Sequence, residues 1–385
     1  MITKNDFNPN YAIHPGETLK EKLEEITMSS KELAIRTSKP TKTISEVING
    51  KSSITPEMAV QFEQVLKIRA SFWIQSQANY NEIIAKQKQE KDIKESEKWA
   101  KKFPYVEMTQ LGWIKSARKI NEKTKELLSY FNISKSSSWY KIYIQSKLRI
   151  NFRISLKYAK DPFALSAWLF QGEKSAQKML APSYNKNILK EKLPILKQMM
   201  VNNPNNLYSK IQSTCRDAGV KIVFTTLLPK TVISGVARWI KNNPVIQISD
   251  RYKRYDIFWF TLFHEIGHII LHSNKKNIFI DDINNINKEN KQEKEANDFA
   301  VKCLLNDDEY YEIVEELKSG KNIIDIIKLF ANKFDTHSDI IIGRLLRDNK
   351  KLYQVSTLRK MITKIDFKEY NLNNNCQEQT KFLKK

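Results

Sequence analysis

The sequence predicts a mainly α-helical protein with a small α+β domain in its C-terminal half. Three observations lead to this fold class. Over residues 11–85 and 105–215, apolar side chains recur at the three- and four-residue spacing of amphipathic helices. Between residues 220 and 249 the pattern changes to short β-rich runs separated by turn residues, which indicates an antiparallel meander. A strongly apolar helix at 256–272 is expected to pack against this sheet.

Composition narrows the class of protein further. Lys and Arg outnumber Asp and Glu by 65 to 43, a net charge of +22 that favours attraction to nucleic acid. The alternative explanation of this charge is a compositional bias, because Lys, Asn and Ile are abundant along the whole chain. Three widely separated cysteines, Cys215, Cys303 and Cys376, fit a reducing cytoplasm better than a disulfide framework. We therefore expect a cytoplasmic protein.

No membrane segment or signal peptide is expected. Residues 1–30 are polar and contain Pro9 and Pro15, unlike a secretory signal. The most apolar stretch, residues 257–271, contains His264, Glu265 and His268 and is too short and too polar to span a bilayer. This stretch is predicted to be a buried helix.

A helix-turn-helix is predicted near the N-terminus. Ser29 and Glu32 have the spacing of a capping box at the start of one helix. A second helix follows Pro40 and stops at Gly50, with its apolar positions facing inward. In such a motif the N-terminal end of the second helix enters the major groove. The residues expected to contact DNA are Thr41, Lys42, Thr43, Ser45 and Lys51.

Periodicity alone does not distinguish this motif from an ordinary helical hairpin, but a longer match does. The string HPGETLKEKLEE, the segment SSKELAIRTSKPTKTISEVINGKSSITPEMAVQFEQVLKI and the later FWIQSQANY together resemble the Xre-like domain of HigA-type antitoxins. The resemblance implies a five-helix, λ-repressor-like domain over residues 10–85. It also implies sequence-specific binding to double-stranded operator DNA, usually as a homodimer.

The middle of the chain, residues 86–204, is predicted to be helical. It begins with the charged run IAKQKQEKDIKESEKWAKK at 84–102, which is typical of an exposed helical connector. Further helices are expected at 108–131, 139–158, 162–180 and 189–200. After the domain at 205–346, a basic C-terminal tail is expected at 347–385, with fraying at its end.

The motif His264-Glu265-Ile266-Gly267-His268 predicts a metal site. Residues four apart lie on one face of a helix, so the two histidines can bind one cation. Glu265 lies beside them, where it can act as a general base towards water. The alternative is a pair of hydrogen-bonded histidines in a buried helix. Against it, three of the chain's five histidines fall within nine residues.

A catalytic zinc site needs a third protein ligand. His272 lies about 12 Å along the helix from His264, too far to share the ion, and is expected to support a ligand instead. Glu295, on the next predicted helix, is the favoured ligand. Glu293 is the alternative, and because the two point about 200° apart, only one can face the metal. Asp298, one turn on from Glu295, could orient a ligand histidine.

The segments FWFTLFHEIGHIILH and EKEANDFAVKCLL resemble the ImmA/IrrE metallopeptidase domain, as do GVARW, ISDRY and IGRL. This resemblance covers roughly residues 205–346. It implies a zincin-like fold of the gluzincin type with Zn²⁺ bound by His264, His268 and Glu295. It also implies that Glu265 acts as the general base.

Two functions follow from these expectations. The first is a DNA-binding transcriptional regulator whose zinc-dependent peptidase domain cleaves a partner regulatory protein. The alternative is a non-proteolytic antitoxin or autorepressor, in which the zinc domain is structural or sensory and binds a toxin. For the peptidase we expect a substrate to add as a strand to residues 233–240 and the loop 273–291 to act as a lid. The candidates for stabilising the oxyanion are Arg238, Tyr252 and His337.

Overall fold

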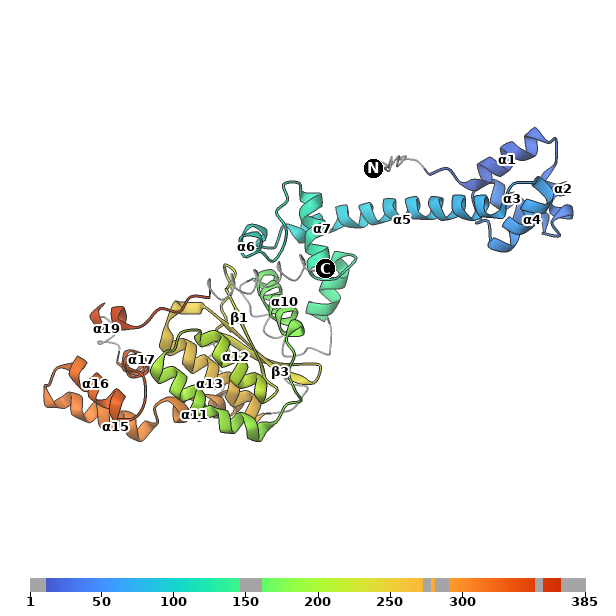
Figure 1. Cartoon of the computed structure of the whole chain (residues 1–385). Helices are drawn as coiled ribbons and strands as arrows, with labels where there is room; N and C mark the ends of the chain where they lie inside the picture. The colour runs from blue at the N-terminus through green and yellow to red at the C-terminus, as the bar shows by residue number, and fades with distance from the viewer. Residues whose placement is uncertain (1–11, 146–160, 273–277, 281–290, 350–355, 368–385) are drawn as a thin grey trace, which may run out of the picture. The chain divides into compact units, whose positions relative to one another are not determined.

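The computed structural model describes residues 12–145, 161–272, 278–280, 291–349 and 356–367. The chain divides into two compact units, Met1–Glu97 and Lys98–Lys385 (Figure 1). The predicted boundary at residue 85 falls inside one long helix. Cys376 and most of the predicted basic tail lie outside the described residues.

The N-terminal unit is the predicted helical domain with five helices. They are α1 (Pro15–Glu25), α2 (Ser30–Arg36), α3 (Thr41–Ile48), α4 (Pro56–Leu66) and the first part of α5 (Ala70–Ala100). The predicted cap is present, because Ser29 Oγ accepts a hydrogen bond from the Glu32 amide at 3.1 Å. The inward faces meet in one core that includes Leu19, Leu33, Ile44, Phe62 and Trp73.

His14 connects three parts of this unit. Its Nδ1 accepts a hydrogen bond from the Gly16 amide at 3.0 Å and so caps α1. Its ring meets the Tyr80 ring on α5 edge-on at 4.7 Å. It also lies against the turn after α3, because a Cβ on Gly50 would be 3.5 Å from the imidazole. The cap therefore also positions the end of α3.

Helix α5 is 31 residues long and includes the charged run that the sequence marks as a helical connector. Residues 84–91 of this helix are exposed. A helix segment that is polar on every face has no core to pack against. Residues 84–91 therefore extend α5 without burying apolar side chains.

The C-terminal unit begins with a series of helical elements, several of which contribute to an aromatic cluster. They are α6 (Tyr105–Gln110), α7 (Ile120–Tyr130), α8 (Ser136–Trp139), the π-helical turn η1 (Tyr140–Gln145), α10 (Pro162–Lys178), α11 (Lys186–Asn202) and α12 (Leu207–Asp217). The predicted single helix at 108–131 is two helices, separated at Gly112, whose φ is +71°. Trp139 stacks on Phe163 with ring centroids 4.8 Å apart.

The sheet differs from the predicted antiparallel meander. Its strands are β1 (Lys221–Thr225), β2 (Gly235–Ile240), β3 (Asn243–Ser249) and β4 (Ile278–Ile280), in the order β1-β3-β2-β4. β2 pairs with β3 and with β4 in antiparallel fashion, whereas β1 pairs with β3 in parallel. β4 falls within the predicted loop 273–291, of which the other residues up to 290 lie outside the described part.

Strand β2 is therefore an inner strand, with β3 on one side and β4 on the other. The expectation that a substrate adds directly to residues 233–240 is wrong for residues 236–238, because both edges of β2 are already paired there. β4 supplies the outer edge on that side of the sheet.

Helix α10 covers one face of the sheet through a buried polar contact. Gln247 Nε2 on β3 donates to the Trp168 carbonyl at 2.8 Å, and Arg238 Nη2 on β2 donates to the Leu169 carbonyl at 2.6 Å. A Cβ on Gly172 would lie 2.0 Å from Gln247 Oε1, so any larger residue there would displace the Gln247 amide from this position. Buried hydrogen bonds of this kind fix α10 on the sheet.

The opposite face of the sheet packs on α13 (Tyr255–Leu271), which is buried over nearly its whole length. Around it lie the remaining helices, α14 (Lys291–Leu304), α15 (Asp307–Glu316), α16 (Ile323–Lys333), α17 (Ser338–Asp348) and α19 (Ser356–Met361), and the short turns η3 (Arg251–Lys253) and η4 (Leu317–Ser319). The predicted buried helix is thus the centre of the main core.

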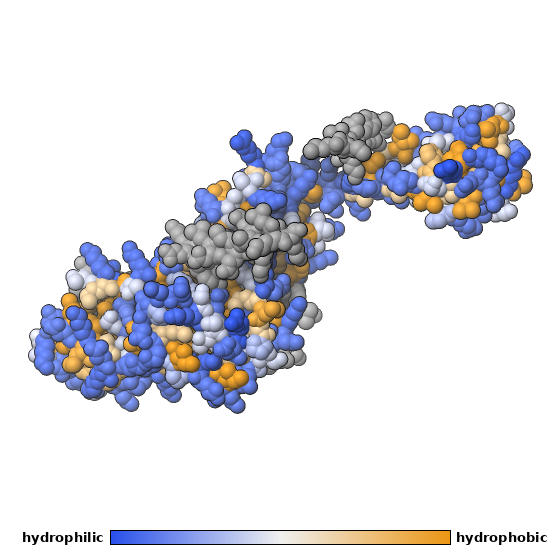
Figure 2. Space-filling model, viewed as in Figure 1, coloured by the Kyte–Doolittle hydropathy of each residue, from blue (hydrophilic) through white to orange (hydrophobic). Residues whose placement is uncertain are grey.

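None of the helices in the described residues combines the length and apolarity needed to cross a membrane. On the face that Figure 2 shows, hydrophilic residues dominate both units and apolar residues form separate small patches.

The burial of His14 predicts a pH dependence in the N-terminal unit. Burial lowers the pKa of His14 below its usual 6.5, although Glu17 opposes the shift. A base with a lowered pKa stabilises the fold only while neutral, so this stability is present above about pH 6.5 and lost as the pH falls through the lowered value. We expect protection of the α1 amides, measured by hydrogen exchange corrected for intrinsic rates, to fall as the pH is lowered below about 6.5.

Asparagine keeps a capping oxygen and has no titratable group. His14→Asn should therefore flatten this pH dependence, while His337→Asn in the other unit should leave it unchanged. The same slope in wild type and His14→Asn would show that another group is responsible.

Candidate functional site

Helix α13 carries the HExxH residues at the centre of the C-terminal unit. His264 and His268 are each 1% exposed and Glu265 is fully buried. The apolar residues on either side of the motif explain this burial, because they pack against the sheet and against α14 and α17. The two histidine rings lie one turn apart with centroids separated by 4.6 Å.

Helix α14 crosses α13 closely at Gly267. A Cβ on this glycine would lie 3.1 Å from the Phe299 ring and 3.4 Å from the Ala296 Cα. Small residues at a helix crossing let the backbones approach, and this approach brings the first turn of α14 over the two histidines.

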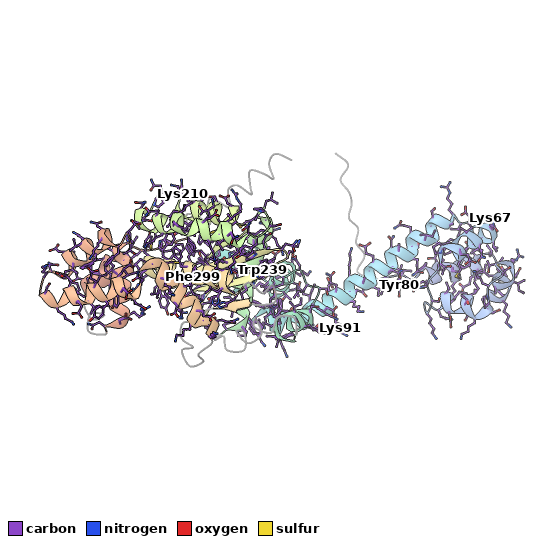
Figure 3. All side chains as sticks on the ribbon, turned by 90° about the horizontal axis from the view of Figure 1, so that it is seen from below. Lys67, Tyr80, Lys91, Lys210, Trp239 and Phe299 are labelled. Atoms are coloured by element: carbon purple, nitrogen blue, oxygen red, sulfur yellow. The ribbon has the colours of Figure 1, made fainter. Side chains whose placement is uncertain are left out.

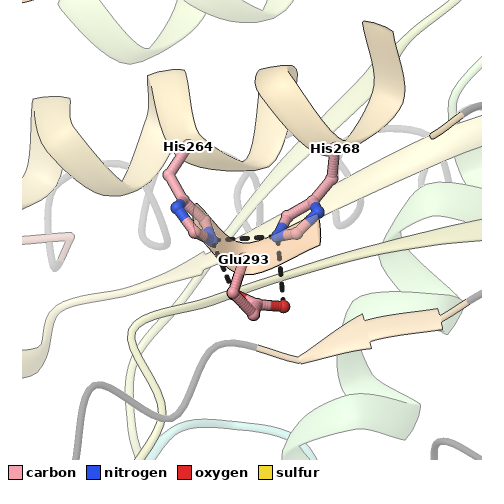
Figure 4. A group of neighbouring side chains, drawn as sticks. All are labelled: His264, His268 and Glu293. Carbon is pink, nitrogen blue, oxygen red and sulfur yellow. Dashed lines mark hydrogen bonds and ion pairs between the residues drawn. The ribbon is translucent and has the colours of Figure 1, made fainter. Parts of the chain in front are cut away.

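Three side chains converge there, His264, His268 and Glu293 (Figure 4). The two histidine Nε2 atoms are 2.9 Å apart. Glu293 places one carboxylate oxygen 3.3 Å from His264 Nε2 and the other 3.5 Å from His268 Nε2. All the ligating atoms thus point into one small volume.

The geometry fits a metal ion. Zinc bonds of about 2.0–2.1 Å in a tetrahedral arrangement place neighbouring ligand atoms about 3.3–3.4 Å apart. The three observed separations, 2.9, 3.3 and 3.5 Å, bracket this value. Two imidazoles and one carboxylate are also the donor set of a catalytic zinc site with three protein ligands.

The structure places Glu293 at this point, not Glu295, which the sequence analysis favours. Ala296, Ala300 and Leu304 form the buried face of α14. Glu293 lies three residues before Ala296 and therefore shares that face, whereas Glu295 is turned away from it. The Glu295 carboxylate instead contacts His272 Nε2 at 2.8 Å. The helical phase of the buried alanines is the signal that would have identified Glu293.

Electrostatics at Glu293 favour the charged carboxylate. Burial acts to raise its pKa, but the hydrogen bonds and charges of His264 and His268 outweigh burial and lower the pKa to about 2. Burial, the larger effect at His268, lowers the pKa of that imidazole. An ionised carboxylate beside neutral imidazoles is the protonation state that binds a metal.

Asn297, which no sequence motif singled out, contacts a histidine of the metal position. Its Oδ1 lies 2.9 Å from His264 Nδ1. With Nε2 facing the metal position, Nδ1 carries the proton and donates to this oxygen, which fixes the ring. Asp298, which the sequence offers for such a role, lies one position further along α14 and is exposed, as Asn297 is.

Strand β2 approaches Glu265 at a glycine. A Cβ on Gly235 would lie 2.6 Å from Glu265 Oε1 and 2.6 Å from Thr261 Cγ2. The Glu265 side chain is therefore confined between α13 and the start of β2.

The three candidates for stabilising an oxyanion are not brought to the metal position by any described contact. Arg238 donates to the Leu169 carbonyl on the α10 side of the sheet. His337 caps α17 and lies against the Tyr255 ring, near the start of α13. Tyr252 is 51% exposed and packs on Arg251.

The residues predicted to contact DNA lie on the surface of the N-terminal unit. Thr41, Lys42, Ser45 and Lys51 are exposed and Thr43 is half-buried, while Ile44 and Val47 fill the core. The Lys42 ammonium is 4.0 Å from Glu46 and remains largely exposed. This arrangement leaves the start of α3 open to a ligand.

Comparison with known proteins identifies both units. The helix-turn-helix family model matches residues 19–73, and the IrrE N-terminal-like domain model matches residues 215–334. Virulence-associated protein A of Dichelobacter nodosus is 41% identical over 69 residues, which cover 17% of this chain and 68% of that protein.

Two solved structures are similar in sequence to about a fifth of the chain. An addiction module antidote protein of the HigA family from Coxiella burnetii is 33% identical, covering 22% of this chain and 92% of its own, with a TM-score of 0.21. A Pseudomonas aeruginosa protein solved in complex with its operator DNA is 29% identical, covering 20% and 82%, with a TM-score of 0.19.

The protein is thus a DNA-binding helix-turn-helix regulator, antitoxin-like in its N-terminal unit, joined to an IrrE-type peptidase domain. Over the N-terminal unit the chain belongs to the Xre-type family that includes virulence-associated protein A.

The convergence of His264, His268 and Glu293 predicts that Glu293→Gln lowers bound metal from one ion per chain to nearly none after dialysis. Loss of the carboxylate charge removes one ligand of three. Metal content by mass spectrometry measures this, with Asp298→Asn as the control on the same helix. Full metal content in Glu293→Gln would contradict the assignment of Glu293 as a ligand.

Proposed function

We propose that this protein is an operator-binding regulator whose C-terminal unit is a zinc-dependent peptidase acting on a partner regulatory protein. The observation that carries this proposal is the convergence of two imidazoles and one carboxylate beside the buried Glu265. The match of residues 215–334 to the IrrE N-terminal-like domain supports the same reaction class.

His264, His268 and Glu293 would hold the zinc ion. When bound, zinc supplies Lewis-acid chemistry to a peptide carbonyl. Asn297 keeps the His264 ring in the ligating tautomer. Gly235 lets β2 approach closely enough to confine the Glu265 carboxylate.

Glu265 performs the proton transfers. As general base it takes a proton from the attacking water, and it then delivers that proton to the nitrogen of the leaving amine. A carboxylate suits this task because it both accepts and returns one proton within a single turnover.

The substrate proposed is a protein that regulates transcription with this chain, and the site of action is the cytoplasm. The N-terminal unit would bring the peptidase to the operator, as a homodimer on a palindromic site. The alternative is an autorepressor or antitoxin that binds a toxin and uses the zinc only for structure or sensing. Cleavage of a partner protein distinguishes the peptidase from this alternative.

The experiment compares wild type with Glu265→Gln against the regulators and toxins encoded beside its gene. We expect one zinc per chain in both proteins but cleavage by wild type alone, because the amide of the substituted side chain cannot accept the proton from water. Mass spectrometry of the products locates the cut. Zinc in both proteins with no cleavage of any neighbouring protein would favour the non-proteolytic alternative.

The DNA-binding surface gives a separate prediction. Lys42→Ala and Lys51→Ala should each weaken binding to the DNA upstream of the protein's own gene and lower the slope of log affinity against log salt by about one. Fluorescence anisotropy over a salt series measures both quantities. Thr43→Ala and Ser45→Ala should instead reduce the preference for this DNA over a scrambled sequence.

Lys91→Ala is the matched control, because Lys91 is exposed on α5 away from α3 (Figure 3). An equal loss of affinity in Lys91→Ala would mean that charge in general, and not the start of α3, determines binding.

A further inference from the structure

A second pair of polar residues continues outward from the metal position. His272 is the C-cap of α13, and its amide donates to the His268 carbonyl at 3.0 Å. Its ring Nδ1 lies 3.3 Å from His268 Nδ1 and its Nε2 lies 2.8 Å from Glu295 Oε2. The His272 side chain is 6% exposed and that of Glu295 is 42% exposed.

One arrangement of protons satisfies both contacts. His268 directs Nε2 towards His264 and Glu293, so as a ligand it must carry its proton on Nδ1. That proton is donated to His272 Nδ1, which must then be unprotonated. The remaining His272 proton lies on Nε2 and is donated to the Glu295 carboxylate.

We propose that His272 and Glu295 are positioning residues that hold His268 in its metal-ligating tautomer and orientation. This inference rests on the proposed metal site. It gives Glu295 a role different from the ligand role that the sequence resemblance implies. Glu293 and Glu295 then act on opposite sides of the His268 ring. Glu293 shares the metal with His268, and Glu295 orients His272, which contacts His268.

Asn297 offers an internal comparison. The Asn297 amide oxygen accepts from His264 Nδ1, as His272 accepts from His268 Nδ1. Each ligand histidine therefore has its own acceptor, and the acceptor on His268 is itself oriented by a charged group. Such outer contacts fix the ring and raise the basicity of the ligand, and their loss typically lowers metal affinity about 10–100-fold.

The test measures zinc affinity by competition with a chromophoric chelator in the full-length protein. We expect His272→Leu, which fills the space but accepts no hydrogen bond, to weaken zinc binding about 10–100-fold. His272→Gln, which offers an amide oxygen as Asn297 does, should recover most of the affinity. Glu295→Gln should weaken binding by less than Glu293→Gln, because the amide oxygen still accepts from His272.

Asp298→Asn is the matched control for Glu295→Gln, since both remove one carboxylate charge from α14, and it should leave the affinity unchanged. Equal affinities in wild type, His272→Leu and Glu295→Gln would overturn the positioning role. Loss of all zinc in Glu295→Gln, with normal binding in Glu293→Gln, would instead make Glu295 the ligand and overturn the proposed metal site as well.

A second readout does not depend on activity. The chain has five histidines, so their ring nitrogens can be assigned individually by ¹⁵N NMR. In the zinc-bound protein we expect the His268 Nδ1 proton, donated to an acceptor in wild type and in His272→Gln, to exchange slowly with water, and to exchange faster in His272→Leu. Equally slow exchange in His272→Leu would refute the proposal even if zinc affinity fell for structural reasons.

Discussion

The close packing of α14 against α13 is the contact on which the metal centre depends. Three residues from the first two turns of α14 contact these histidines, namely Glu293, Glu295 and Asn297. Gly267 and Ala296 make the approach possible, because a Cβ on Gly267 would already be 3.1 Å from Phe299. A larger residue at either position would separate the helices and move the Glu293 carboxylate away from both imidazoles.

The sheet holds the other half of the site. Ile222, Phe224, Ile246 and Ile248 face the main core with α13, while Val223 and Val245 face Ala176 on α10. Successive side chains of β1 and β3 thus point alternately to the α13 face and the α10 face of the sheet. The polar contacts of Gln247 and Arg238 lie on the α10 face. Because α10 holds the sheet on the face opposite α13, Gly235 on β2 lies at a fixed position against Glu265.

Local signals in the sequence were enough to predict one helix cap and the two metal-facing histidines. The capping pair Ser29 and Glu32 and the spacing of His264 and His268 depend only on neighbouring residues, and both appear in the structure as expected. The order of the strands was not predictable in this way, because β1 pairs with β3 across a long connection. The choice between Glu293 and Glu295 depended on which face of α14 is buried, and that is decided by packing against Gly267.

The burial of Glu265 bears on whether the proposed metal site is catalytic or structural. A structural zinc site usually has four protein ligands and needs no further carboxylate. In the part of the chain that the structure describes, the ligating group has three members, and Glu265 is fully buried beside it without belonging to it. Burying a carboxyl group costs free energy, so a purely structural site would gain stability from an apolar residue here. A glutamate at this position, with a glycine on β2 making room for it, is what a proton-transferring site requires.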